Sequence, residues 1–403
     1  MLHGGWRAAT ACLGLTEFSE TLRRARQLFG WLGVLGIFAG LLAAFAATLV
    51  LSVSLLHNKG SRGTDAGTPE FQRSEKPKFD AGDYQQSRFP KVTGRPLIGV
   101  NYTHYEFPNC YFLRRKYVLA AYQNPGVATT VHQQLMQMRS SGIESIRTVI
   151  WYDAVGQKWG PIPAPAGILR EPFRTNLIRY VTEIKRFGFA RLTIAFEPKR
   201  ANNPLLHGYR PTRFAENWRF IRQVRSIVKR YGPRQTRFDL LGEGAPNATA
   251  TGYEPLPSQT GRYLRDLYRL YVRRYGNRDV SVSAITSQLP YPTNRLENLI
   301  RILRSAGETL PRWYDVHIGF DAHRAAYGLR TAESQLKRQA QIQPLVIDDA
   351  GYDSPAIAKV IRRFVRRTGR RLEEVTPWYT RTRLGCPVPP PYVPGAYATL
   401  RKR

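Results

Sequence analysis

The sequence predicts a (β/α)8, or TIM, barrel preceded by one N-terminal transmembrane helix. After residue 95, eight short runs rich in Val, Ile and Leu alternate with amphipathic stretches. That alternation is typical of parallel strands joined by crossover helices. Near the N-terminus, 29 consecutive residues hold no charged side chain, which is long enough to span a bilayer. The two patterns divide the chain into an anchor and one large folded domain.

The uncharged stretch covers residues 28–56 and follows Arg23, Arg24 and Arg26. Positive residues mark the cytoplasmic side of a span, so residues 1–27 are expected to be a cytoplasmic tail. A cleaved signal peptide, the competing interpretation, would have an apolar core of only ~7–15 residues. Residues 57–90 are poor in aliphatic side chains and are expected to form a flexible stem. Residues 91–403 then form the barrel outside the cytoplasm, in a periplasm, at a cell surface or in a secretory lumen.

The chain is strongly basic, with 61 Lys and Arg against 29 Asp and Glu, a net charge of +32. Residues 91–403 hold 51 of the basic and 22 of the acidic residues, so this part alone carries +29. Such a field attracts polyanions and anionic membrane surfaces, although it also serves solubility alone. The sequence has no zinc-finger, basic-zipper or ribonucleoprotein motif, so no nucleic-acid partner is expected. An anionic polysaccharide or an anionic membrane is the partner that this charge favours.

The predicted strands are buried on both faces, because their apolar runs are nearly continuous. They cover residues 97–102, 145–151, 191–197, 237–243, 279–285, 315–320, 344–349 and 375–379. Helical spacing of apolar residues predicts helices over 129–141, 173–187, 213–231, 263–275, 296–306, 331–340 and 355–368. A doubly wound open sheet is the alternative, but no G-x-G-x-x-G follows the first run. The proline-rich C-terminal residues predict a short or missing eighth helix.

A closed barrel makes its first and last strands neighbours. Cys110 lies in the loop after the first predicted strand, and Cys386 in the loop after the last. Both loops leave the same face of the barrel, so a Cys110–Cys386 disulfide is geometrically reasonable in an exported domain. Two separate free thiols are the alternative.

Barrel enzymes carry their working residues at the C-terminal ends of the strands. At the predicted ends, this sequence collects polar and aromatic side chains: Asn101, Tyr102, Arg147, Trp151, Glu197, Glu243, His317, Asp321, Asp348, Asp349, Trp378 and Tyr379. Sugar hydrolysis needs two carboxyl groups, one to protonate the leaving oxygen and one to attack or stabilise the anomeric carbon. Aromatic rings supply flat apolar faces against which a pyranose can pack.

With these motifs in place, residues 95–385 resemble the clan A glycoside hydrolases, which are retaining (β/α)8 enzymes. The run FDLLGEGAPN resembles the segment that carries the family's acid/base, and Glu243 falls on that position. The run PLVIDDAGYDS resembles the nucleophile segment, and Asp349 falls on the nucleophile position, followed by Gly351 and Tyr352. The resemblance of GIESIRTVIWY implies that Arg147 lies beside the nucleophile and keeps it ionised.

The resemblance also implies contacts with the sugar. His317 falls near the position of a substrate-binding or orienting His, and Trp378 resembles the family's sugar platform. Asn101 and Tyr379 are expected to line the same site. Arg147 could instead serve a structural ion pair, and His317 could be a buried interior histidine.

The sequence departs from the family pattern at two positions. Gly242 stands where the family has Asn, so a hydrogen bond to the sugar 2-hydroxyl lacks its usual source. Asp349 stands where the family has Glu, and its side chain is one methylene shorter. The shorter side chain could widen the gap between the carboxyls, admit a water and give inversion, or leave the site unproductive. Asp348 could serve instead, although strand alternation points it the other way.

The expected function is therefore a membrane-tethered glycoside hydrolase or transglycosidase that acts on extracytoplasmic polysaccharide or glycoconjugate through Glu243 and Asp349. The alternative is a catalytically inactive carbohydrate-binding or scaffolding barrel, with Gly242 and Asp349 as marks of lost catalysis. A third class, an extracytoplasmic structural protein, would have no open pocket at the strand ends. Neither H-E-x-x-H, paired C-x-x-C, G-x-S-x-G nor a P-loop occurs, so no metal and no cofactor is expected.

Overall fold

The computed structural model describes residues 95–106, 116–156, 160–249, 256–287, 293–351, 354–377 and 395–401. The predicted tail, transmembrane helix and stem, the Cys110–Cys386 disulfide, and Trp378 and Tyr379 lie outside these ranges. None of the helices within them is long and apolar enough to cross a membrane.

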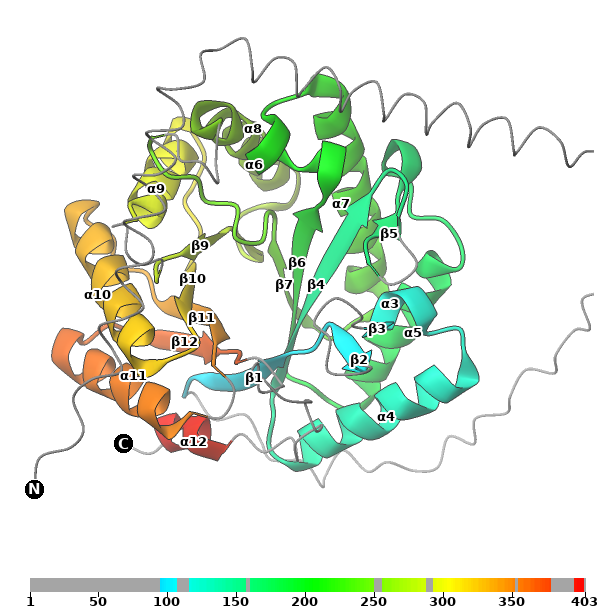
Figure 1. Cartoon of the computed structure of the whole chain (residues 1–403), viewed down its shortest axis with the longest axis horizontal. Helices are drawn as coiled ribbons and strands as arrows, with labels where there is room; N and C mark the ends of the chain where they lie inside the picture. The colour runs from blue at the N-terminus through cyan, green and yellow to red at the C-terminus, as the bar shows by residue number, and fades with distance from the viewer. Residues whose placement is uncertain are drawn as a thin grey trace, which may run out of the picture. The chain divides into compact units, whose positions relative to one another are not determined.

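The described residues form a closed barrel of parallel strands surrounded by helices (Figure 1). The eight strand positions, in chain order, are β1 (Leu97–Asn101), β4 (Ser145–Asp153), β6 (Arg191–Pro198), β7 (Gln235–Asp239), β8 with β9 (Val280–Ser281 and Ser283–Ile285), β10 (Tyr314–Gly319), β11 (Leu345–Ala350) and β12 (Leu372–Val375). Each strand pairs with the next, and β1 pairs with β12 through Leu97–Glu374 and Ile98–Val375. This confirms the predicted barrel and the predicted contact of its first and last strands.

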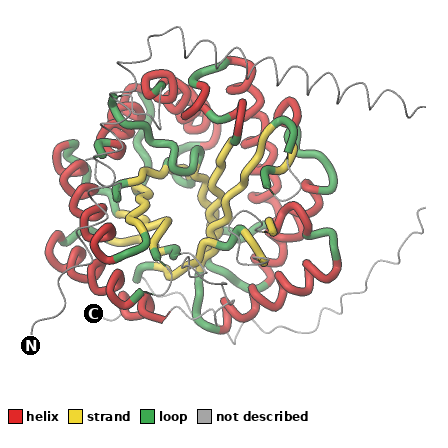
Figure 2. Tube along the Cα trace, in the orientation of Figure 1, coloured by secondary structure: helices red, strands yellow, loops and turns green. Residues whose placement is uncertain are grey.

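Helices alternate with the strands along the chain and form a ring around the barrel (Figure 2). The long ones are α4 (Pro125–Ser140), α5 (Phe173–Arg186), α7 (Pro211–Tyr231), α8 (Pro257–Tyr275), α9 (Arg295–Ser305), α10 (Ala322–Arg338) and α11 (Pro355–Thr368). Short helices are α3 (Val118–Ala121), α6 (Pro204–His207) and α12 (Gly395–Ala398), and β2 (His104–Glu106), β3 (Lys116–Tyr117) and β5 (Ile162–Pro163) are short strands. Within the described ranges, one turn of helix and a 3-10 turn, Thr399–Arg401, are all that follow β12, as the proline density predicts.

Local sequence explains where several helices begin. Pro occupies the first turn of α4, α7, α8 and α11, where its missing N–H leaves no bond unmade. The side chain of Asp321 accepts a hydrogen bond from the N–H of Arg324 at 2.8 Å and caps α10. Ser354 caps α11 in the same way through the N–H of Ile357. These caps fix the point at which each chain segment leaves the rim of the barrel.

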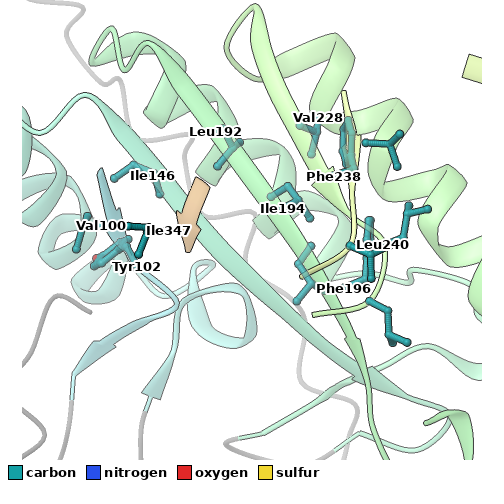
Figure 3. Packing of buried hydrophobic residues seen from close by; sticks show 14 of the residues in the cluster. Val100, Tyr102, Ile146, Leu192, Ile194, Phe196, Val228, Phe238, Leu240 and Ile347 are labelled. Carbon is teal, nitrogen blue, oxygen red and sulfur yellow. The ribbon is translucent and has the colours of Figure 1, made fainter. Parts of the chain in front are cut away.

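The apolar core lies between the strands and the outer helices. Side chains such as Ile194, Phe196 and Phe238 point outward from neighbouring strands, and Val228 of α7 packs in the same cluster (Figure 3). Their burial against the helices supplies the hydrophobic stabilisation of the fold. The barrel strands are therefore apolar mainly on their outward face.

The interior of the barrel is charged, which the prediction of strands with two apolar faces did not anticipate. Arg147 of β4 donates to Asp239 of β7 at 3.4 Å and lies 3.3 Å from Asp348 of β11. Arg237 of β7 donates to Glu374 of β12 at 2.9 Å. None of these pairs joins adjacent strands, so the contacts run across the interior. All five side chains are buried.

Three buried aspartates gather in this interior. Asp239, Asp315 and Asp348 each place an oxygen within 4.8 Å of the others. Burial raises the pKa of Asp239 to about 6, against the opposing charge of Arg147. Burial, followed by repulsion from Asp348 and Asp239, raises the pKa of Asp315 well above its usual range. Both effects favour the neutral form of Asp315 over its charged form.

This charge balance predicts opposite effects for two isosteric substitutions. The pKa of Asp315 is raised in the folded state, so this carboxyl lowers the free energy of unfolding once the pH exceeds its pKa in the unfolded chain, and the loss grows with pH. Asp315→Asn removes that loss. The variant should gain about 1–3 kcal/mol of stability at pH 7 and little near pH 4. Asp348→Asn takes a partner from buried Arg147 and should lose about 3 kcal/mol. Urea unfolding at several pH values measures both, and equal losses in the two variants would contradict the charge assignment.

Candidate active site

Two of the predicted site carboxyls meet at the C-terminal rim of the barrel with a histidine between them. Nδ1 of His317, on β10, lies 3.1 Å from Oε1 of Glu243 and 3.6 Å from Oδ2 of Asp349 on β11. One oxygen each from Glu243 and Asp349 and one ring nitrogen of His317 all lie within 4.8 Å of one another. His317 and Asp349 are buried, whereas 40% of the Glu243 side chain is exposed. Glu243 is therefore the member of the trio that faces solvent.

Glu243 is positioned by a loop, which corrects the sequence prediction that it ends a strand. β7 ends at Asp239, four residues earlier. The backbone of Glu243 has φ +57°, a left-handed conformation that costs roughly 1–2 kcal/mol for a residue with a side chain. Its N–H donates to Oγ of Ser283 at 2.7 Å, and the N–H of Gly242 donates to the carbonyl of Phe196 at 2.8 Å. These two bonds hold the strained turn against β9 and β6.

An irregular strand pairing brings Asp349 to the same place. The register between β10 and β11 shifts at His317, so that His317 pairs with Asp349 rather than Asp348. Asp348 lies deeper, where it pairs with Arg147 and accepts a hydrogen bond from the hydroxyl of Thr376 at 3.4 Å. Consecutive residues of β11 thus contact two different sets of interior partners. Asp348 does not contact His317, so Asp349 is the nucleophile candidate that the geometry favours.

Asn101 and Arg147 form the floor beneath this trio. The amide nitrogen of Asn101 donates to the carbonyls of Asp348 at 2.5 Å and Thr376 at 2.8 Å, and its oxygen accepts from Arg147 at 3.0 Å. Both amide N–H groups are therefore committed to backbone. Arg147 itself pairs with Asp239 and Asp348 and reaches Asp349 only through its longer-range field. The floor orients Asp348 and the strands around it, while the trio lies above it.

The pKa values of Glu243 and His317 indicate which of the two groups holds the proton they share. Burial raises the pKa of Glu243, but the hydrogen bond and charge of His317, with help from Arg147 and Lys199, outweigh burial and bring it to about 2. Burial lowers the pKa of His317, but the hydrogen bond and charge of Glu243 and the charge of Asp349 outweigh it and raise the pKa above its usual value. Both shifts favour a proton on the imidazole of His317 next to an ionised Glu243.

A third carboxyl, Glu197 near the end of β6, lies against Gly242, the residue before Glu243. The sequence pattern placed it among the polar strand-end residues as a structural or substrate-contacting side chain rather than a catalytic one. Its Oε2 accepts from Nε1 of Trp151 at 2.8 Å and from Nζ of Lys199 at 2.6 Å. A Cβ placed on Gly242 would lie 2.9 Å from Cγ of Glu197. The sequence signal was present, since Glu197 ends a predicted strand, but nothing in a linear pattern pairs it with Gly242.

Among the residues that the structure describes, two clusters have donor sets suited to a cation. They are the rim trio Glu243, His317 and Asp349, and the interior carboxyls Asp239, Asp315 and Asp348. The rim trio offers one imidazole and two carboxylates, ligands that divalent transition metals accept. Its imidazole nitrogen is instead directed at both carboxylates as a proton donor, which competes with any metal for the same lone pairs.

Comparison with known proteins identifies no family for the chain, since no family model and no curated protein matches it. A glycoside hydrolase family 5 enzyme of Prevotella bryantii, solved with a xyloglucan tetradecasaccharide, is 13% identical, with 78% of this chain and 98% of that one covered and a TM-score of 0.48. A Prevotella bryantii endo-β-mannanase/endo-β-glucanase is 10% identical, with 77% and 49% covered and a TM-score of 0.48, so this chain spans about half of it. The Escherichia coli homocysteine methyltransferase is 14% identical, with 75% and 96% covered and a TM-score of 0.45. Activity has to be argued from the site, because one fold hosts many chemistries.

The strained backbone of Glu243 predicts an unusual order of stabilities. Glu243→Gly and Glu243→Ala both remove the carboxyl, but only glycine adopts φ +57° without strain, so the glycine variant should be more stable by about 1 kcal/mol. At Arg363, inside α11, the order should reverse because alanine favours helices over glycine. Urea denaturation of the four variants measures this. An alanine variant at residue 243 as stable as the glycine variant would contradict the strained conformation.

Proposed function

We propose that this protein is a retaining glycoside hydrolase or transglycosidase, with Glu243 as acid/base and Asp349 as nucleophile. The observation that carries the proposal is the placement of the two carboxyls at the barrel rim, with an oxygen of each within 4.8 Å. Retaining enzymes need carboxyls ~5–5.5 Å apart, whereas inverting enzymes need ~6.5–9.5 Å to admit a water. The register shift that sets Asp349 opposite His317 supports the retaining arrangement despite the shorter side chain of Asp349.

His317 supplies the proton that acid catalysis needs. In the resting site, the proton is on the imidazole 3.1 Å from Glu243. When a glycosidic oxygen approaches Glu243, the proton passes from Nδ1 to Oε1 and on to the leaving oxygen, while Asp349 attacks the anomeric carbon and forms a glycosyl ester. In the second half-reaction, Glu243 takes a proton from the incoming water or acceptor sugar, and the ester breaks. The trio begins and ends with one proton.

The proposed setting follows from the N-terminal sequence. Residues 28–56 would anchor the protein, residues 57–90 would act as a tether, and the barrel would act on polysaccharide or glycoconjugate outside the cytoplasm. Trp378 and Tyr379 would add aromatic faces to the sugar site, and no metal or cofactor takes part in the proposed steps.

A catalytically silent carbohydrate-binding barrel is the second candidate. Gly242 favours it, because the residue before the acid/base brings no side chain to the sugar. The two functions differ in one observable: turnover requires ionised and protonated carboxyls together, whereas binding tolerates the corresponding carboxamides.

Covalent trapping tests the nucleophile. Activated 2-deoxy-2-fluoro glycosides of the gluco, manno and galacto series should leave one glycosyl ester on Asp349, identified by mass spectrometry of the peptide. Asp349→Asn should give no adduct and lose about 10³-fold or more in kcat. Asp321→Asn, at an exposed helix cap, is the matched control and should label normally. Turnover with inverted stereochemistry and no adduct would contradict the retaining mechanism.

The shared proton predicts a shift in pH dependence. The wild type should lose kcat/KM as the pH rises through the raised pKa of His317, because the trio then loses its proton. In His317→Gln, the proton must be held by Glu243 alone, so the alkaline limb of the profile should move to lower pH. Profiles of kcat/KM against pH for the two proteins measure this. An unmoved alkaline limb would show that His317 does not hold the catalytic proton.

A further inference from the structure

The carboxylate of Glu197 is held in place against Gly242, the residue that precedes the proposed acid/base. Trp151 and Lys199 both donate to its Oε2, and the Trp151 ring packs against His104 and Tyr117 with ring centroids 5.0 and 6.0 Å away. Nζ of Lys199 also lies 5.3 Å from the centre of the Trp151 ring. Among the described residues, none donates a hydrogen bond to Oε1 of Glu197. One oxygen is therefore fixed in place and the other is left to accept a new donor.

Gly242 makes room for this carboxylate. A Cβ on Gly242 would lie 2.9 Å from Cγ and 3.0 Å from Oε1 of Glu197, closer than Cβ contacts normally come. Glu197 thus occupies the space into which a side chain at residue 242 would project. The carboxylate of Glu197 can lie here only because residue 242 has no side chain. Gly242 is also the residue directly before Glu243.

The chemistry of a carboxylate decides which part of a sugar it can contact. In a two-carboxylate mechanism, the anomeric carbon lies between the acid/base and the nucleophile, and its neighbours are the ring oxygen and C2. An ionised carboxylate only accepts hydrogen bonds, and so does the ring oxygen, so the two repel each other. The substituent on C2 is the neighbour that can donate.

The charge of the rim favours a cationic donor. The rim gathers three carboxyl groups, those of Glu197, Glu243 and Asp349, against the basic groups of Lys199 and His317. A 2-ammonium group would form an ion pair with Glu197 in which donor and acceptor are both charged, whereas a hydroxyl would supply a neutral donor. A 2-acetamido group brings no positive charge and a bulkier acceptor oxygen.

We infer that Glu197 is a specificity-determining residue that binds a free 2-amino group, and that the sugar at the cleaved bond is a 2-amino-2-deoxy sugar. The inference rests on the proposed glycosidase function and adds its substrate class. Glu197 takes no part in bond making or breaking; it positions the sugar through C2.

The test compares matched pairs of 4-nitrophenyl glycosides on the full chain: the 2-amino-2-deoxy, 2-hydroxy and 2-acetamido forms of the gluco, manno and galacto series. In the series that is hydrolysed, the wild type should prefer the 2-amino form over the 2-hydroxy form by about tenfold or more in kcat/KM. Glu197→Gln removes the charge and keeps the shape, so this preference should fall to about one, with turnover of the hydroxy form largely retained.

Two further variants separate specificity from general damage. Gly242→Ala pushes against Glu197 and should reduce the preference in the same direction. Glu308→Gln, in a surface pair with Arg273, should leave the preference at its wild-type value. An unchanged preference in Glu197→Gln, or a wild type that favours the hydroxy form, would overturn the inference while leaving the glycosidase function standing.

If no pair is hydrolysed, the proposed function fails and binding decides the inference separately. Calorimetric titration with glucosamine oligosaccharides should then show tighter binding to the wild type than to Glu197→Gln by about tenfold. Equal affinities, or no binding to either protein, would overturn the role of Glu197.

Discussion

The arrangement of the site depends on the buried contacts that Arg147 makes in the barrel interior. It contacts Asn101 on β1, Asp239 on β7 and Asp348 on β11, strands that are not all neighbours. A buried guanidinium without partners would cost several kcal/mol, so these groups must be satisfied together. Once Asp348 is committed to Arg147, the next residue, Asp349, is the one that remains for the rim. The buried ion pair therefore selects which of two adjacent aspartates can face a substrate.

The floor and the rim of the barrel treat their charges differently. In the floor, burial and mutual repulsion drive Asp315 toward its neutral form, which limits the net charge held away from water. At the rim, His317 holds both Glu243 and Asp349 in reach of one proton, and Glu243 retains contact with solvent. Fewer ionised groups in the floor stabilise the fold, whereas the chemistry proposed for the rim needs ionised groups there. The two demands meet at consecutive residues of β11, where the register shift separates them.

The sequence predicted the barrel because outward-facing residues carry the apolar signal. Ile194, Phe196 and Phe238 pack against helices, and their spacing shows which segments are strands. The contacts among the inward-facing charged residues could not be predicted, because a single aspartate within an apolar run does not indicate which residue it meets across the barrel. The sequence left the separation of Glu243 and Asp349 open. An oxygen of each lies within 4.8 Å of the other, for a reason that strand periodicity does not supply.

Two local features account for what the sequence could not supply. Glu243 reaches the rim through a left-handed turn held by Ser283, and such a conformation is set by tertiary bonds rather than by the residue's own preference. The predicted eighth strand ran over 375–379, whereas β12 covers Leu372–Val375. Glu197 and Gly242 lie 45 positions apart in the sequence. That Glu197 fills the space of a side chain at residue 242 becomes apparent only when β6 and the turn after β7 lie side by side.

The sign of charge changes between the protein as a whole and its proposed site. The chain carries +32, with Arg363, Arg366 and Arg367 exposed on α11, whereas the rim trio and Glu197 contribute an excess of carboxylates. At physiological ionic strength, fields between exposed charges decay over roughly 8 Å, so the basic exterior and the acidic rim act on different parts of a large ligand. In the proposed function, the exterior would hold an anionic glycan or membrane surface, while the rim would select the sugar that enters. A substrate with acidic groups outside the cleaved bond and an amino sugar at that bond would satisfy both fields, whereas a uronic acid at the bond would be repelled by three carboxylates. The basic composition therefore does not require an anionic sugar in the site, because on this proposal different residues would attract the ligand and select the sugar.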